Sequence, residues 1–224
     1  TLAAFRLGAQ HGYRMFECDA KLSADGVPFL LHDATLERTT NGRGTGGDLP
    51  LGALAQLDAG SWHSRAYAGE AVPTLEALAR FCIANGYFLN IEIKPTPGQE
   101  ETTGRVVGET AARLWQGQAV PPLFSSFKPD ALAGAQATAA HIPRALLLDT
   151  LWDGCLDTAR RLGCVAIVCN HALWDAALVA QVKGMGMRTL SYTVNDDWAA
   201  QRLIALGTDG IITDRVDLFS PATP

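Results

Sequence analysis

The sequence has no long hydrophobic run and no cluster of positive charge. Although 48% of its 224 residues are hydrophobic, no stretch approaches the roughly 20 consecutive apolar residues that a membrane-spanning helix needs. The net charge of −5 at pH 7 is mild, and no segment is rich in Lys or Arg. These absences argue against a membrane span, and against nucleic acid or an anionic membrane surface as a partner.

The sequence also lacks paired cysteines. Its cysteines are odd in number and form no CxxC motif: Cys18, Cys82, Cys155, Cys164 and Cys169. Several lie in apolar runs, where a free cysteine behaves as a small hydrophobic residue. This favours a reducing compartment over a disulfide framework. No signal peptide is evident, and we expect a cytoplasmic protein.

Neither a GxGxxG fingerprint nor a P-loop is present, but from residue 74 onward short apolar runs alternate with amphipathic segments. The apolar runs predicted as strands are 87–94, 121–127, 144–149, 164–170, 188–194 and 209–214. Such alternation indicates parallel strands covered by helices, in either an open doubly wound sheet or a closed barrel. Polar residues that end strand after strand favour the barrel. We therefore predict an α/β fold, a (β/α)₈ TIM barrel formed by one domain over residues 1–224.

The first third of the chain departs from this repeat. The run 15–20 reads as a strand, but 27–33 follows it after only "SADG", which is too short for a parallel crossover and predicts an antiparallel hairpin. That leaves seven barrel strands. The chain opens with a helix capped by Thr1, so we expect the first barrel strand to be absent from this sequence. Residues 33–73 are predicted to be a small insertion after the second strand, either a lid over the site or a packed surface loop.

Two acidic residues lie two apart in the strand 15–20. Residues i and i+2 of a strand share a face, so Glu17 and Asp19 project together. A two-residue turn centred on Ala24 and Asp25 would place His32 opposite Glu17, to within one residue. Local geometry thus predicts two carboxylates and an imidazole in one place.

The strand 87–94 adds further polar groups by the same alternation. Asn90, Glu92 and Lys94 share one face, and in a barrel that face is the interior. Three carboxylates on neighbouring strands repel one another unless a cation lies between them, and oxygen ligands in that number suit Mg²⁺ or Ca²⁺. Lys94 then provides a second positive group for an anionic substrate such as a phosphate. Each feature alone is as well explained by ordinary ion pairing, and only their conjunction favours a metal site.

At this point the sequence resembles a known family. The segments "ECDAKLSADGVPFLLHDATLERTTNGRG", "NIEIKP", "SSF", "YTVN" and "GTDGIITD" occur in the order found in glycerophosphodiester phosphodiesterases, most strongly in the bacterial cytosolic type associated with glycerol-3-phosphate uptake. The resemblance implies a barrel with a divalent cation, Mg²⁺ or Ca²⁺, held by Glu17, Asp19 and Glu92. It implies hydrolysis of glycerophosphodiesters such as glycerophosphocholine and glycerophosphoethanolamine to sn-glycerol 3-phosphate and an alcohol.

The resemblance also implies roles for single residues. His32 matches one of two histidines that act as general acid and base, and Lys94 matches a lysine on the phosphate side. The other histidine belongs to an HRG motif in the strand that we expect to be missing. Tyr192 stands where many relatives carry Trp, and it could form, with Asn195, part of the substrate site. Ser125 and Ser126 could bind substrate or simply be satisfied strand-end hydroxyls, and we interpret Arg38 and Arg43 as loop-anchoring ion pairs.

Two other functions stay open at this stage. The first is a lipid-directed phosphodiesterase such as a lysophospholipase D, which would need an exposed apolar rim or a membrane anchor. The second is a catalytically inactive barrel that still binds a metal or a phosphodiester. Retention of Glu17, Asp19, His32, Glu92 and Lys94 together favours the active enzyme.

Overall fold

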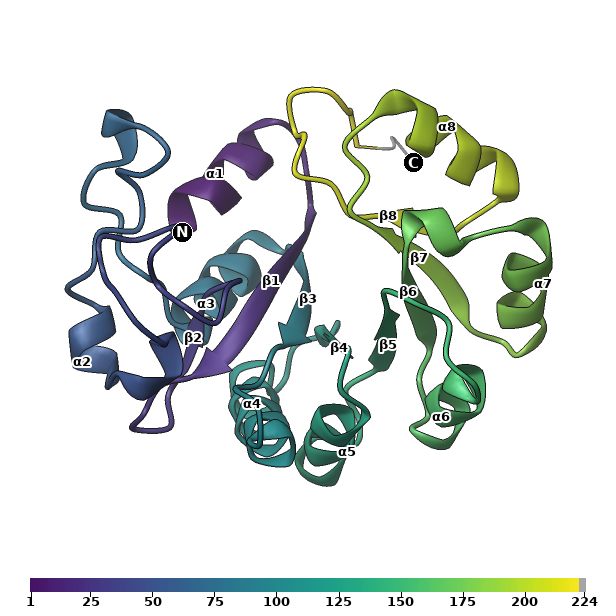
Figure 1. Cartoon of the computed structure of the whole chain (residues 1–224), viewed down its shortest axis with the longest axis horizontal. Helices are drawn as coiled ribbons and strands as arrows, with labels where there is room; N and C mark the ends of the chain where they lie inside the picture. The colour runs from purple at the N-terminus through teal and green to yellow at the C-terminus, as the bar shows by residue number, and fades with distance from the viewer. Residues whose placement is uncertain (222–224) are drawn as a thin grey trace.

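In the computed structural model, which describes residues 1–221, eight strands form one sheet that curls into an open barrel with the helices on its outer side (Figure 1). The strands are β1 (Met15–Leu22), β2 (Pro28–Leu30), β3 (Phe88–Ile93), β4 (Leu123–Ser126), β5 (Arg144–Leu148), β6 (Ala166–Asn170), β7 (Arg188–Tyr192) and β8 (Gly210–Ile211). The α-helices are α1 (Leu2–Gln10), α2 (Leu51–Leu54), α3 (Leu75–Asn85), α4 (Glu100–Leu114), α5 (Pro129–Thr138), α6 (Cys155–Arg161), α7 (Ala176–Gly184) and α8 (Asp197–Leu206). Short 3₁₀ segments are η1 (Gly46–Asp48), η2 (Arg65–Tyr67) and η3 (His171–Leu173).

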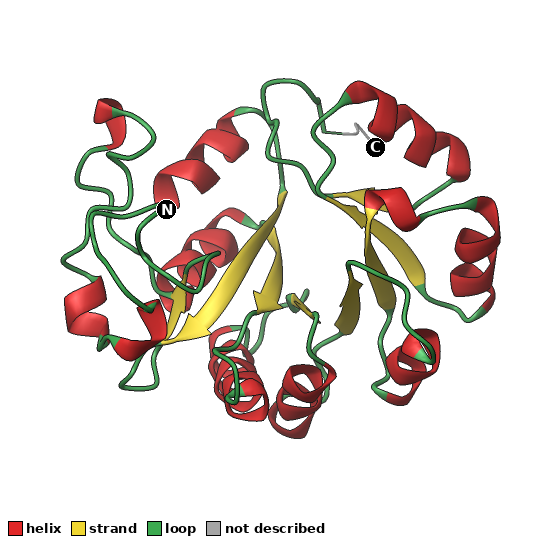
Figure 2. Cartoon of the chain, in the orientation of Figure 1, coloured by secondary structure: helices red, strands yellow, loops and turns green. Residues whose placement is uncertain are grey.

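The sheet order is β2-β1-β3-β4-β5-β6-β7-β8, parallel throughout except for the antiparallel β2 (Figure 2). Each of the six runs predicted as strands after residue 74 contains a strand, and β2 is the predicted hairpin partner of β1. The curled sheet with helices outside confirms the barrel architecture over the doubly wound alternative. None of the helices in the described part of the chain is long and apolar enough to cross a membrane.

The register of the hairpin differs by one residue from that of a two-residue turn, which is the margin that the prediction allowed. Ala20 pairs with Leu30, and the amide of Leu31 donates to the Asp19 carbonyl at 3.2 Å. The reason lies in Gly26, whose φ of +77° suits a left-handed position after a tight turn. The connection therefore has three residues rather than two, and when the same register is continued, His32 falls level with Cys18, one residue from the position opposite Glu17.

Alternating side chains divide the sheet into two faces. The outer face contributes Cys18, Ala20, Ile91, Ile93 and their equivalents on later strands to a large core shared with the helices. The inner face is apolar on one side of the barrel, where a separate cluster of buried residues comprises Ala145, Leu147, Ala166 and Val168. On the other side, β1 and β3 turn polar residues inward. The inward-facing polar residues of these two strands therefore lie on one side of the barrel interior.

The sheet is open between β1 and β8, which are not paired with each other in the described residues. The segment after β8 crosses this side of the molecule, drawn in yellow between α1 and α8 in Figure 1. There the Tyr13 hydroxyl donates to the Phe219 carbonyl at 2.8 Å. The opening lies beside the strand that carries Glu17 and Asp19. The expectation of a further strand upstream of residue 1 stays a prediction.

Residues 33–73 lie between β2 and α3 and pack around a small core of their own. This core comprises Phe29, Leu31, Leu36, Leu54, Ala59 and Val72. It includes two residues of the hairpin segment that leads to His32, so the insertion is anchored to the barrel by apolar packing. This packing fits the packed-loop interpretation, and a role of the segment as a lid stays a prediction.

Helices α4 and α5 approach each other at glycines. A Cβ atom at Gly104 would collide with the carbonyl oxygen of Ala131, and one at Gly134 would collide with the carbonyl of Glu101. Since these contacts are to backbone, a side chain at Gly104 cannot be accommodated by a rotamer change. This pair of helices covers the outer side of β3 and β4.

We expect Gly104→Ala to lower the free energy of unfolding by about 2–3 kcal/mol, because the helices must separate. The control is Gly184→Ala at the end of α7, where an added Cβ meets no atom within 4 Å. That change should be neutral or stabilise the protein by up to about 1 kcal/mol through helix propensity. Urea unfolding of both variants measures the difference, and equal stabilities would contradict the proposed collision.

Candidate active site

Three carboxylates meet at the inner face of two neighbouring parallel strands. Glu17 and Asp19 lie on β1 and Glu92 lies on β3, where Asp19 pairs with Glu92 in register. One oxygen of each lies within 4.8 Å of the others. The intervening residues Cys18 and Ile91 face the helices and fix this orientation. The predicted cluster of Glu17, Asp19 and Glu92 is therefore present as a geometric feature.

The electrostatics of this cluster are unfavourable without a cation. Burial raises the pKa of Glu17 well above its usual value, and the charges of Asp19 and Glu92 raise it further. Burial, followed by the Asp19 charge, raises the pKa of Glu92 to about 7, against an opposing effect of Lys94. Glu92 Oε1 is also buried and has no hydrogen-bond partner in the described part of the chain. Hard oxygen donors that crowd together and remain unsatisfied fit a divalent cation such as Mg²⁺ or Ca²⁺.

Lys94 is the positive group closest to the carboxylates. It follows the last residue of β3, and its Nζ lies 3.0 Å from Asp19 Oδ1 and 3.6 Å from Glu92 Oε1. One ammonium cannot neutralise three ionised carboxylates, so the ionisation of all three requires a further positive charge. Lys94 thus lies in the group in which the sequence predicts it.

Lys21 is an inward-facing residue that the sequence analysis missed. It continues the alternation of Glu17 and Asp19, is only 4% exposed, and donates from Nζ to the Lys94 carbonyl at 3.3 Å. Burial, and then the nearby charge of Lys94, lowers its pKa. The signal that could have identified it is the same i, i+2 spacing that selected the two acids. Lys21 ties the end of β1 to the end of β3.

His32 follows the hairpin and is held by a carboxylate next to it in sequence. Its Nδ1 lies 2.7 Å from Asp33 Oδ1, while 65% of its side chain is exposed. Arg38 donates to both oxygens of Asp33, at 2.6 and 2.8 Å, and chiefly for this reason the pKa of Asp33 lies well below its usual value. Arg38 is thus an ion-pairing residue, as interpreted, whereas Arg43 makes no ion pair with a carboxylate in residues 1–221.

The two remaining predicted residues lie on the β7 side of the barrel. Tyr192 donates from its hydroxyl to the Leu148 carbonyl at 3.1 Å, and its ring meets Phe127 edge-on at 5.6 Å. Burial raises its pKa, with smaller contributions from the charges of Asp149 and Glu92. Asn195 instead donates to the Asp214 carboxylate at 3.0 Å and accepts from the Asp214 amide. The charge of Glu92 thus contributes to the raised pKa of Tyr192. Asn195, in contrast, joins the loop after β7 to the loop after β8.

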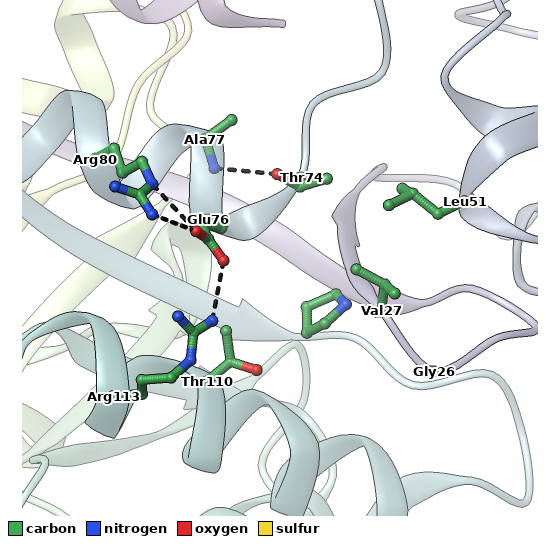
Figure 3. A pocket seen from close by; sticks show the side chains of 10 residues that line it. Gly26, Val27, Leu51, Thr74, Glu76, Ala77, Arg80, Thr110 and Arg113 are labelled. Atoms are coloured by element: carbon green, nitrogen blue, oxygen red, sulfur yellow. Dashed lines mark hydrogen bonds and ion pairs between the residues drawn. The ribbon is translucent and has the colours of Figure 1, made fainter.

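A pocket of about 500 Å³ lies elsewhere, between the hairpin turn and helices α2, α3 and α4 (Figure 3). Glu76 lies at its centre and accepts hydrogen bonds from Arg80 and Arg113. These arginines are paired with a carboxylate, and none of the predicted site residues lines the pocket. Its size alone does not make it the reactive centre, because the crowded carboxylates and the histidine lie at the barrel interior and on the hairpin.

Comparison with known proteins gives one consistent result. A family model described as the glycerophosphoryl diester phosphodiesterase family matches residues 1–218. YhdW of Bacillus subtilis is 32% identical over 98% of this chain and 90% of its own length. A glycerophosphodiester phosphodiesterase of Caldanaerobacter subterraneus is 30% identical over 96% of this chain and 87% of its own. A solved Oleispira antarctica phosphodiesterase, in complex with the product sn-glycerol-3-phosphate, has a TM-score of 0.89 and 34% identity, covering 96% of this chain and 86% of that one.

We expect millimolar Mg²⁺ or Ca²⁺ to raise the melting temperature of the chain relative to EDTA, since a cation relieves the repulsion among the three carboxylates. A hundredfold excess over Kd would add about 2.7 kcal/mol of stability. The double variant Glu17→Gln with Glu92→Gln should melt higher than the unmodified chain in EDTA and should lose the cation-dependent increase. Differential scanning calorimetry with NaCl at matched ionic strength separates binding from charge screening; an equal increase with NaCl would contradict a specific site.

Proposed function

Because the chain belongs to the glycerophosphoryl diester phosphodiesterase family, we propose that it hydrolyses glycerophosphodiesters to sn-glycerol 3-phosphate and an alcohol. Glycerophosphocholine and glycerophosphoethanolamine are the proposed substrates. The observation that carries the proposal is the meeting of Glu17, Asp19 and Glu92 with Lys94 at the barrel interior. The product complex of the Oleispira relative supports the same reaction.

We assign the cation to Glu17, Asp19 and Glu92, with Mg²⁺ and Ca²⁺ both compatible with three carboxylates. When bound, the cation would neutralise charge on the phosphodiester oxygens. Lys94 would supply a second positive charge to the phosphate, since its ammonium already lies at the edge of the cluster. Tyr192 would offer an aromatic wall on the opposite side, and Asn195 would act from the loop after β7.

His32 is assigned to proton transfer. Its Nδ1 is engaged by Asp33, which leaves Nε2 available to donate a proton to the oxygen of the departing alcohol. Asp33 would accept a hydrogen bond from Nδ1 and so hold the ring in place. Arg38 keeps Asp33 ionised and fixed, so that the ring has one preferred orientation.

We further propose a cytoplasmic location. The five cysteines are all free and all buried. Unpaired buried thiols are typical of proteins that fold in a reducing compartment.

The direct test is release of sn-glycerol 3-phosphate from glycerophosphocholine with Mg²⁺, Ca²⁺ or EDTA. It is run on the 224-residue chain and on a chain extended upstream by an HRG-bearing strand, because the resemblance expects a second histidine there. Activity that EDTA abolishes would support the proposal. A folded, cation-binding protein that is inactive in both forms would indicate a binding-only barrel and would exclude the proposed reaction.

In the active form, Glu92→Gln should abolish cation-dependent turnover and weaken cation binding. His32→Ala should instead leave cation binding nearly unchanged and reduce kcat by about 10²–10⁴, the usual contribution of one acid or base. Steady-state kinetics and isothermal titration calorimetry together separate these roles. Full activity of His32→Ala would remove His32 from the mechanism, and unchanged cation affinity in Glu92→Gln would remove Glu92 from the ligand set.

A lipid-directed phosphodiesterase is the second candidate, because such an enzyme needs exposed apolar residues at the rim of the barrel and this chain has two there. Leu151 and Trp152, in the loop after β5, are 50% and 41% exposed. This loop leaves the carboxyl end of a barrel strand, where substrates of such barrels bind. Lysophosphatidylcholine therefore belongs in the same assay as a second substrate. Faster turnover of the lysolipid than of glycerophosphocholine would favour this candidate.

A further inference from the structure

Two polar side chains beside the carboxylates have buried oxygen atoms without a partner. Within residues 1–221, Asn90 Oδ1 and Ser125 Oγ make no hydrogen bond, and Ser125 is 0% exposed. A buried polar atom without a partner destabilises the folded state, because the hydrogen bonds that it made to water in the unfolded chain are not replaced. Such atoms therefore point to a group that satisfies them in the working protein.

Their positions in the sheet relate them to the carboxylates. Asn90 on β3 pairs in register with Glu17 on β1, and Ser125 on β4 pairs with Glu92 on β3. Asn90 and Glu92 are two residues apart and share the inner face. The two unsatisfied oxygens thus flank Glu17 and Glu92 on the same face of the barrel.

The neighbouring serine shows that these atoms are unsatisfied because of where they lie. Ser126 faces the opposite way, donates from Oγ to the Ile93 carbonyl at 2.6 Å, and accepts from the Lys128 amide at 3.1 Å. Ser125 has the same chemistry one residue earlier but no protein partner. Ser126 is therefore a structural hydroxyl, whereas Ser125 has an unmet hydrogen-bonding capacity beside Glu92.

We propose that Asn90 Oδ1 and Ser125 Oγ accept hydrogen bonds from water molecules that accompany the cation at Glu17, Asp19 and Glu92. This rests on the cation site of the proposed function. Mg²⁺ in particular keeps several of its waters when it binds to carboxylates, and those waters need acceptors. Residues that hold groups around a metal commonly contribute 10–100-fold to its affinity. Asn90 and Ser125 are positioning residues for the cation rather than proton carriers.

The test compares Ser125→Ala with Ser126→Ala by two readouts that do not require turnover. In EDTA, Ser125→Ala should melt at the same temperature as the unmodified chain or higher, because it removes an unsatisfied hydroxyl. It should nevertheless weaken Mg²⁺ affinity about 10-fold in isothermal titration calorimetry. Ser126→Ala should do the reverse, with a lower melting temperature and a Kd within about twofold of the unmodified chain, since it removes two internal hydrogen bonds.

Asn90→Leu extends the test to the second residue, with a side chain of similar size that cannot accept a hydrogen bond. Its Mg²⁺ affinity should fall at least as much as that of Ser125→Ala. Unchanged affinity in Ser125→Ala would overturn the inference, as would a fall in affinity accompanied by a matching loss of stability in EDTA. A higher KM for glycerophosphocholine at unchanged cation affinity would assign Ser125 to the substrate instead, and this too would overturn it.

Failure of the inference and failure of the proposed function are distinguishable in the same experiment. If the unmodified chain binds neither Mg²⁺ nor Ca²⁺, the cation site itself is wrong. If it binds a cation and Ser125→Ala binds equally well, only the roles of Ser125 and Asn90 are wrong.

Discussion

The crowding of Glu17, Asp19 and Glu92 is the constraint on which the rest of the site depends. Three carboxylates whose oxygens lie within 4.8 Å of one another repel each other, and burial disfavours the charged forms of Glu17 and Glu92. They can stay together only because the strands that carry them are fixed by other interactions. The outer face of β1 and β3 supplies that fixation, since Cys18, Ala20 and the residues opposite them belong to the large helix-covered core.

The two sides of the barrel interior differ in the kind of residue that they contain. On the β5 to β7 side, small and branched apolar residues fill the interior and stabilise the fold. On the β1 and β3 side, the same inward positions carry carboxylates, lysines and an amide. Lys21 links these two strands by donating to the Lys94 carbonyl, so its buried ammonium group helps to hold the polar side together. The favourable free energy of apolar packing elsewhere in the sheet thus offsets the unfavourable free energy of the polar cluster.

The features that could be predicted from the sequence are those that depend on the alternation of side chains along a strand. Glu17, Asp19, Glu92 and Lys94 could be grouped because alternate residues share a face and parallel neighbours stay in register. The position of His32 could be predicted only to within one residue, because the left-handed Gly26 makes a three-residue connection that composition does not distinguish from a two-residue one. Sequence reasoning could not separate Ser125 from Ser126, since their difference lies in whether distant groups such as the Ile93 carbonyl reach them.

The hairpin and the insertion together explain how a mostly exposed histidine is held in one orientation. His32 lies beyond the end of β2, and 65% of its side chain is exposed. Its orientation comes from Asp33, and the orientation of Asp33 comes from Arg38 within the insertion. The insertion is anchored to the barrel through Leu31 and its own small core. The three carboxylates are therefore positioned by the sheet and His32 by the insertion. Under the proposed function, a change in the insertion core should then affect proton transfer through His32 and leave cation binding at the carboxylates unchanged.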